Sequence, residues 1–560
     1  MVGRILVIGV DILGFTITYG NPFKIIVPGG KGPDDYAPLT NCKGGGVKWT
    51  IEAPQSRLNP INAIYGNPQL DYTRKISEPL PGFPSLSRKV KVPVKDTAYF
   101  YFAGNGSACN TNVLRKPILF IDGFDPTNSR GVKQIYEDYI NKGVTRNSTP
   151  VFFGDYMLSQ QYDFVILDFK HGNDLLERNA MTLVSLLERL YQTYGATFEQ
   201  EITIIGPSMG SLIAQYALAY MEHNNIPHHV KTYISFDGCH QGANVPIGLQ
   251  NMVEYLTKRG LFSKLNAVKS LVREGLYNGL AARQMLAHHT RANSQSPAPD
   301  GLRTQFLANL QAVGEYPSLT RNVALINGVS NGVINENHPI ANQTLLHIIN
   351  KRRGWKSLWG ACNWKICKNV DWECKSSPNN GSARVSDMWT LNPVINLIFW
   401  VPPFETIKYA SAAWGSSSLD NAPGGKFGSV FGTTGGDVDQ KKMNFLLKEF
   451  FYLLTGSKRT TFSQNINNFT MMPSYSSADL RFPGPTNNSG KNLYKNWSQE
   501  YLCGKTPFDY VYAPKNANEE HVFVSQKGSE WFEAEVKCQR EDLPVFFSPV
   551  INGSSTVCAP

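Results

Sequence analysis

A serine lies at the centre of residues 206–210, Gly-Pro-Ser-Met-Gly, in the spacing of a nucleophilic catalyst. The apolar run at 201–205 predicts a short buried strand, and residues 211–223 carry apolar side chains at helical spacing. Strand, G-x-S-x-G and helix form a nucleophile elbow, a sharp turn that raises the serine hydroxyl above the sheet. The helix after the turn directs its N-terminal amides at the site, which favours developing negative charge. The pattern therefore predicts Ser208 as a nucleophile.

A serine hydroxyl is a weak nucleophile at neutral pH, so it needs a general base. In this architecture the chain order is serine, acid, histidine, which places the base late in the sequence. His521 is the only histidine after His347, and it follows the expected last core strand at 509–514 by a few residues. We therefore assign His521 as the base. Its chief rival is His240, whose glycine-rich setting favours a structural role in a turn.

The acid that orients the histidine stays open between several carboxylates. The loop after the next core strand is its usual place, and Glu336 is the only carboxylate there. Asp237 directly follows an expected strand at the carboxyl edge of the sheet, where ligands bind in open α/β sheets, and is the first choice. Asp437, Asp439 and Asp479 are further candidates.

Two backbone amides are candidates for stabilising the oxyanion. Met209 directly follows the nucleophile, the position that supplies one donor in an elbow. The second donor is expected from the turn after an early strand, and the Phe124 amide in the turn at 121–126 fits that place. A plain tight turn is the alternative interpretation of the second segment.

Short apolar runs alternate with helical patterns along the chain, which predicts a mostly parallel sheet with helices on both faces. The expected strands are 97–103, 117–122, 162–168, 201–205, 230–236, 323–327 and 509–514. The expected helices are 174–194 and 211–223.

Three segments divide the chain in this interpretation, and the middle one contains two insertions. Residues 1–90 form an N-terminal extension of loops and short strands, residues 91–545 form the α/β domain, and residues 546–560 form a tail. Within the domain, 247–318 is a helical insertion that could be a lid or a packing layer. Residues 340–440, rich in Trp, Cys and Gly, form a second insertion without a clear periodic pattern.

The composition is that of a globular protein, with 42% apolar residues and a net charge of +10. No dense Lys/Arg run is present, so a nucleic-acid partner is not expected. The spacings of the clustered cysteines do not match the usual C-x2-C zinc pattern, and the nine cysteines favour disulfides in an exported protein over reduced thiols. The N-terminus is a poor signal peptide, and no apolar stretch reaches the length of a membrane span. A secreted or cell-envelope location is the expectation.

The chain resembles the α/β-hydrolase superfamily, and more closely its lipase and esterase members. The resemblance is carried by residues 121–126, 206–210 and 235–250. The last of these is similar to the PH-x-G-A segment of bacterial lipases, with Cys239 where proline is usual, and Asp122 stands where many lipases have histidine. Residues 237–250, together with residues 281–286, are similar to segments of large secreted esterases of Bacteroidetes type.

The resemblance implies ester hydrolysis through an acyl-enzyme, without a metal or an organic cofactor. The large aromatic and apolar insertions suit a hydrophobic or polymeric ester, as in lipid degradation. A serine peptidase or acyltransferase on the same fold is one alternative, and a non-catalytic binding protein on a hydrolase scaffold is another. The sequence leaves the oligomeric state open.

Overall fold

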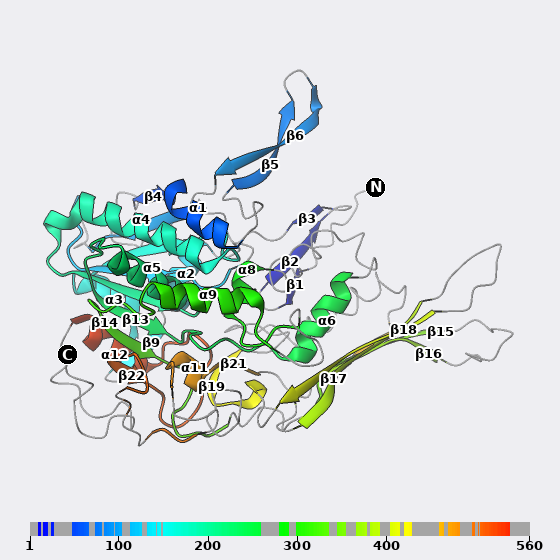
Figure 1. Cartoon of the computed structure of the whole chain (residues 1–560). Helices are drawn as coiled ribbons and strands as arrows, with labels where there is room; N and C mark the ends of the chain where they lie inside the picture. Colours follow the sequence, from blue (N-terminus) through cyan, green and yellow to red (C-terminus); the bar gives the residue numbers. More distant parts are fainter. Residues whose placement is uncertain are drawn as a thin grey trace.

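The structure is a computed structural model that describes three short strands near the N-terminus and most of residues 47–537 (Figure 1). The N-terminal strands are β1 (Gly9–Ile12), β2 (Phe15–Gly20) and β3 (Lys24–Ile26). The gaps within 47–537 are residues 66–72, 81–82, 94–95, 104–111, 126–130, 142, 147–148, 259–278, 291–297, 335–343, 354–365, 378–380, 393–403, 415–418, 428–458, 464–468, 482–494, 499–501 and 503.

Within the described residues, the central sheet has eight strands, and seven of them run in one direction. Strand β7, which lies between β11 and the edge strand β4, runs opposite to the other seven. The strand order is β22 (Tyr510–Tyr512), β14 (Arg321–Leu325), β13 (Val230–Phe236), β12 (Ile202–Pro207), β8 (Pro117–Ile121), β11 (Asp163–Asp168), β7 (Asp96–Tyr101) and β4 (Lys48–Ile51). The mostly parallel sheet expected from the sequence is confirmed.

Alternate residues of the central strands enter two separate hydrophobic cores, as the period of two in a strand requires. In β8, Leu119 and Ile121 belong to one core, while Ile118 and Phe120 belong to the other. These strands read as continuous apolar runs because both faces of the sheet are covered by helices.

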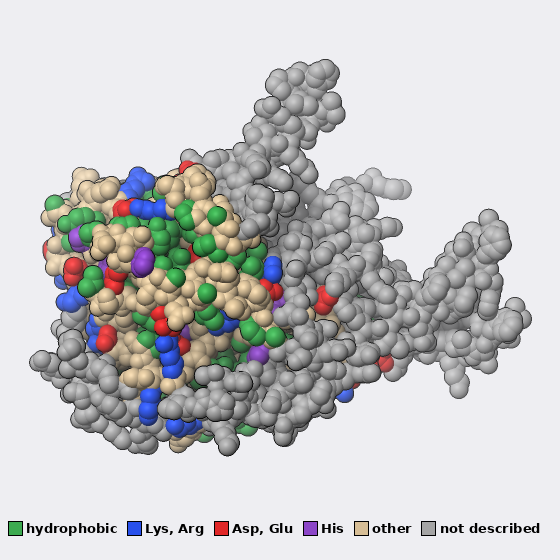
Figure 2. Space-filling view, in the orientation of Figure 1, with side chains coloured by type: hydrophobic (Ala, Val, Ile, Leu, Met, Phe, Trp, Pro, Cys, Tyr) green, Lys and Arg blue, Asp and Glu red, His purple; other side chains and the backbone are tan. Residues whose placement is uncertain are grey.

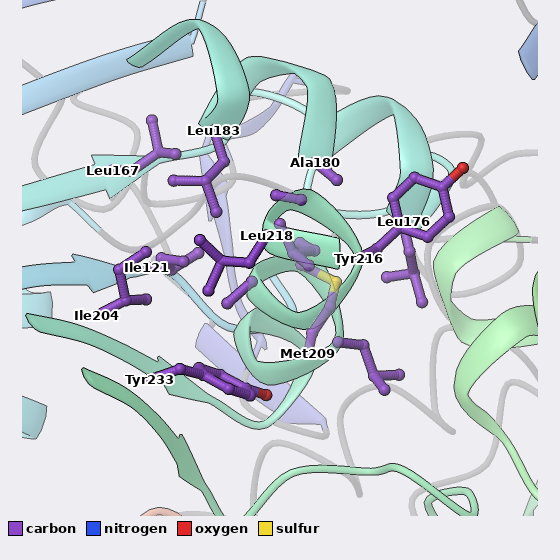
Figure 3. Packing of buried hydrophobic residues seen from close by; sticks show 14 of the residues in the cluster. Ile121, Leu167, Leu176, Ala180, Leu183, Ile204, Met209, Tyr216, Leu218 and Tyr233 are labelled. Atoms are coloured by element: carbon purple, nitrogen blue, oxygen red, sulfur yellow. The ribbon is translucent and has the colours of Figure 1, made fainter. Parts of the chain in front are cut away.

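Helices cover each face. The first core lies under α4 (Leu176–Tyr194) and α5 (Met209–His223), with α1 (Gln55–Ile64), α8 (Leu280–Met285) and α9 (Gly301–Ala312) beside them. Figure 3 shows side chains from α4 and α5 meeting those of Leu167, Ile121 and Ile204 from the strands. The second core lies under α2 (Val132–Ile135), α3 (Phe153–Ser159) and α12 (Gln526–Lys537).

A second, antiparallel sheet is formed by the insertion at 340–440 and the segment after it (Figure 1, yellow). Its strand order is β18 (Phe404–Trp414), β17 (Gly381–Asn392), β16 (Ile366–Lys375), β15 (Thr344–Arg353) and β20 (Arg459–Ser463). The helix α6 (Ile247–Lys258) packs on this sheet so closely that a Cβ on Gly248 would lie 2.4 Å from the Val385 carbonyl oxygen.

The central sheet begins earlier in the chain than the expected boundary at residue 90. Strand β4 pairs with β7 and forms the edge of the sheet, although it comes from the segment that the sequence assigned to an N-terminal extension. The run Lys-Trp-Thr-Ile is only four residues long and half exposed, so it lacks the apolar length that marked the other strands. A hairpin of β5 (Thr73–Leu80) and β6 (Phe83–Pro93) separates it from β7.

Two cysteines with described side chains, Cys239 and Cys374, are buried free thiols. The side chains of the other seven lie outside the described residues, so disulfides and export stay predictions. Among the described helices, none combines the length and apolar character of a membrane-spanning segment. On the face shown in Figure 2, charged side chains of both signs are scattered between apolar ones.

Candidate active site

Ser208 occupies the turn between β12 and α5. Its backbone has φ 50 and ψ −115, a conformation that L-residues adopt only under constraint. The strand and helix approach each other closely there, because a Cβ on Gly206 would lie 2.6 Å from the Gly210 carbonyl oxygen. The elbow expected from the sequence is therefore present, with the serine at its apex.

Asp237 follows β13, the neighbour of β12 in the sheet, and the register pairs Pro207 with Phe236. The residues directly after these two, Ser208 and Asp237, therefore lie side by side at the carboxyl edge. Asp237 is fully buried and also has a positive φ, of 48°. Its amide donates to the Leu325 carbonyl at 2.6 Å, which ties the turn to β14.

The Asp237 carboxylate accepts three hydrogen bonds. His521 Nδ1 lies 2.6 Å from Oδ2, while the Asn327 amide at 3.1 Å and the Ser477 hydroxyl at 2.9 Å donate to Oδ1. Because a carboxylate only accepts, Nδ1 carries the imidazole proton, and Nε2 is left as an acceptor. This Nε2 is buried and forms no hydrogen bond with any described residue.

His521 lies in the loop after β22, and backbone contacts hold that loop. Its amide donates to the Lys426 carbonyl at 2.8 Å, in β19 (Gly424–Phe427). Asn518 fixes the loop from the other end, since its Oδ1 accepts from the amides of Val329 and Gly424 at 2.9 and 3.0 Å. Val522, next to the histidine, has φ 57. Positive φ thus occurs at Ser208, at Asp237 and beside His521, and such backbone strain clusters at functional sites.

The two amides expected to bind an oxyanion come from adjacent segments. Met209 is the first residue of α5, so its amide is one of the four without a partner inside the helix. The turn after β8 lies against the same helix, because a Cβ on Gly210 would be 3.1 Å from the carbonyl oxygens of Ile121 and Asp122. Phe124, two residues further on, is partly buried against the core under α5.

His240, the rival base, is buried in a polar cluster of its own. Ser235 Oγ lies 2.8 Å from its Nε2, and Gln215 Oε1 and Tyr316 OH lie 2.9 and 3.1 Å from its Nδ1. Burial lowers the pKa of His240 to about 4, so the imidazole is neutral at physiological pH. Both ring nitrogens of this histidine are therefore engaged within the cluster, which is compatible with the structural role expected from the sequence.

Of the alternative acids, Asp479 is the one that the structure describes. Asp479 accepts from Tyr316 OH at 3.0 Å and from Arg481 at 2.7 Å, and the same Tyr316 hydroxyl lies 3.1 Å from His240 Nδ1. His347 pairs with Asp371 across β15 and β16 in the second sheet. Glu336, Asp437, Asp439 and His338 lie outside the described residues. Among the residues that the structure describes, no group of three or more His, Cys, Asp and Glu side chains could hold a metal ion.

Sequence reasoning missed a second carboxylate beside the histidine. Glu519 accepts from the Asn327 side chain at 3.2 Å, and the Asn327 backbone amide binds Asp237. Burial raises the pKa of Glu519 to about 7, and the Asp237 charge adds to the rise, against hydrogen bonds from Asn327 and Ser525 and the charge of Lys426. The sequence shows Glu519 and Glu520 side by side before the histidine, and nothing in it indicates that Glu519 is the less exposed of the two.

Glu519 is expected to make the protein less stable as the pH rises towards neutrality. Its folded-state pKa is about 7, against 4.5 for the free side chain, so the folded protein holds a proton that the unfolded chain releases between these values. The free energy of unfolding therefore falls by about 3 kcal/mol across this window. Denaturant unfolding from about pH 4.5 to pH 8 measures the fall, and Glu519→Gln should flatten it.

The matched control is Glu520→Gln, the exposed next residue, which should leave the pH dependence of stability unchanged. Parallel stability curves for the wild type and Glu519→Gln would contradict the burial of a proton at Glu519.

No family model matches the sequence, and no curated protein matches it. Similar solved structures include the lipase BlEst2 of Bacillus licheniformis in its propeptide form, at 14% identity and a TM-score of 0.22, over 38% of this chain and 36% of that chain. Est1E from Butyrivibrio proteoclasticus is similar at 12% identity and a TM-score of 0.23, over 41% of this chain and 74% of that one. The peroxisomal α/β-hydrolase Lpx1 of Saccharomyces cerevisiae is similar at 11% identity and a TM-score of 0.23, over 51% and 75%.

At these TM-scores the likenesses carry no argument about activity, and this chain spans little more than a third of the Bacillus lipase. The fold is therefore assigned from the elements of this structure. A mostly parallel sheet, helices on both of its faces and a strand–serine–helix turn at its carboxyl edge fit the α/β-hydrolase fold.

Proposed function

We propose that the protein is a serine carboxylester hydrolase that acts through an acyl-enzyme on hydrophobic or polymeric esters. One observation carries the proposal. His521 is bound to a buried carboxylate through Nδ1, while its Nε2 has no hydrogen bond among the described residues. The loop that carries this histidine follows a strand at the same sheet edge as the Ser208 elbow. A histidine in this state can accept a proton from a nucleophile.

In the proposed acylation step, Ser208 Oγ attacks the ester carbonyl and His521 Nε2 takes the hydroxyl proton. The carbonyl oxygen becomes an oxyanion, which the amides of Met209 and Phe124 stabilise. The tetrahedral intermediate then collapses, and the alcohol leaves with the proton from His521. Asp237 stabilises the imidazolium and keeps Nδ1 as the donor.

Deacylation repeats these steps with water as the nucleophile. His521 takes a proton from the water, the hydroxide attacks the acyl-serine, and the carboxylic acid leaves as Ser208 recovers the proton. The same amides stabilise the second oxyanion.

Exposed apolar side chains near the histidine loop support a hydrophobic substrate. Val333 and Ile334 are 44% exposed, and Phe523 is 36% exposed. The side chain of Asn518, in the histidine loop, donates to the Val333 carbonyl, and the side chain of Asn327 donates to the Phe523 carbonyl. Within the insertion at 247–318, α8 and α9 contribute side chains to the core under α4 and α5, which supports a packing layer rather than a lid.

Hydrolysis of p-nitrophenyl esters with acyl chains of about two to sixteen carbons tests the proposal, together with labelling of Ser208 by a fluorophosphonate. We expect hydrolysis and a single labelled peptide containing Ser208, both lost in Ser208→Ala. The chain-length optimum separates an esterase from a lipase. Labelling without ester hydrolysis would favour a peptidase or an acyltransferase, and a wild type that does neither would favour a binding protein.

A further inference from the structure

Ser477 donates the one side-chain hydrogen bond, besides that of His521, that the described part of the chain places on the Asp237 carboxylate. Its Oγ lies 2.9 Å from Oδ1, and both side chains are fully buried. Ser477 ends the short helix α11 (Ser474–Ser477), which follows β21 (Phe469–Pro473). The two residues are 240 positions apart in the chain. A segment that follows the second sheet in the chain therefore reaches back to the candidate acid.

A buried carboxylate depends strongly on its donors, because a lost hydrogen bond to a charged group is not replaced by water. The two donors on Oδ1 are the Asn327 amide and the Ser477 hydroxyl, and they fix the rotation of the carboxylate about its Cβ–Cγ bond. That rotation decides whether Oδ2 points at His521 Nδ1. The Ser477 hydroxyl thus affects the geometry of the hydrogen bond between His521 and Asp237, although it bonds only to the other carboxylate oxygen.

The unit that carries Ser477 also reaches the histidine. Strand β21 pairs with β19, and the Lys426 carbonyl in β19 accepts the His521 amide at 2.8 Å. The Ser474 amide donates to the Pro423 carbonyl at 2.8 Å, which joins α11 to the start of the same strand. One compact piece of structure therefore fixes both the orientation of Asp237 and the position of the His521 backbone.

We infer that Ser477 is a positioning residue for Asp237 in the reaction, an inference that rests on the proposed function. Its hydroxyl bonds to the carboxylate, and it acts through that group. Its loss lets the carboxylate rotate, so that His521 Nδ1 is held less often in the productive geometry.

The rate of Ser208 labelling by a fluorophosphonate tests this without knowledge of the natural substrate. We expect Ser477→Ala to lower the maximal labelling rate about 10- to 100-fold, the range for a hydrogen bond to a charged group, and to leave the half-saturating concentration unchanged. In an Asp237→Asn background, Ser477→Ala should cost less than about threefold further, because the carboxylate through which it acts is gone.

The matched control is Ser476→Ala. Ser476 is equally buried, but its hydroxyl bonds to the Gln241 amide and the Gly242 carbonyl rather than to Asp237. Its labelling rate should stay within about threefold of the wild type. Ser477→Cys keeps the size of the side chain with a weak donor, so it should give an intermediate rate and stands in if the alanine variant does not fold.

Labelling of Ser477→Ala at the wild-type rate would overturn the inference while leaving the proposed function in place. An equal loss from Ser477→Ala in the wild-type and the Asp237→Asn backgrounds would also overturn it, since the effect would then be a general loosening of the fold. A wild type that does not label at all would remove the proposed function, and with it the role of Ser477.

Discussion

Asp237→Asn is expected to lower kcat about a thousand- to ten-thousand-fold while the protein stays folded. The two donors at Oδ1, the Asn327 amide and the Ser477 hydroxyl, should hold the oxygen of the new side-chain amide. Its NH2 group then faces His521 Nδ1 in place of Oδ2. The histidine must accept there, so its proton moves to Nε2, and the base is in the wrong tautomer to deprotonate Ser208.

Steady-state kinetics on the best p-nitrophenyl ester, beside thermal unfolding, measure this effect. Asp479→Asn is the matched control, because Asp479 is also buried, also has a positive φ, of 43°, and is an alternative acid on sequence grounds. Its variant should keep kcat within about tenfold of the wild type, because the Asp479 carboxylate bonds Arg481 and Tyr316 rather than His521. Retention of wild-type kcat by Asp237→Asn would show that another carboxylate serves the histidine.

The core of the fold could be predicted because each central strand shows its character locally. Strands buried on both faces read as apolar runs, and the elbow confines strand, serine and helix to about twenty consecutive residues. Strand β4 escaped prediction because an edge strand of four half-exposed residues has neither the length nor the apolar continuity of its neighbours.

The surroundings of the acid could not be predicted in the same way. Asp237 was recognisable as a carboxylate at a strand end, but the contact that selects it spans 284 residues to His521. Ser477 and Glu519 carry no motif, since their partners are fixed only when β19, β21 and the loop after β22 pack together. The residue types near the site are visible in the sequence, whereas their pairing is a property of the assembled sheet edge.

Gly425→Ala is expected to lower kcat about 100-fold or more through a single added methyl group. A Cβ at this position would lie 2.2 Å from Asp237 Oδ2, the oxygen that accepts from His521, and 3.2 Å from Cγ. A carboxylate at the end of a free side chain could move aside, but this one is fully buried and held by two donors on its other oxygen. Relief of the clash therefore displaces Oδ2 from the histidine or displaces β19, whose Lys426 carbonyl holds the His521 amide.

The backbone at Gly425 has no positive φ, so alanine is compatible with the chain conformation and the effect comes from the clash with Asp237. Gly301→Ala is the matched control, because a Cβ at this first residue of α9 meets no atom within 4 Å. It should leave kcat unchanged and stability equal or slightly higher. If the 2.6 Å contact between Asp237 and His521 is what the methyl group disturbs, Gly425→Ala should add little to the loss already caused by Asp237→Asn. Full activity of Gly425→Ala would mean that the carboxylate can leave its place without cost to the reaction.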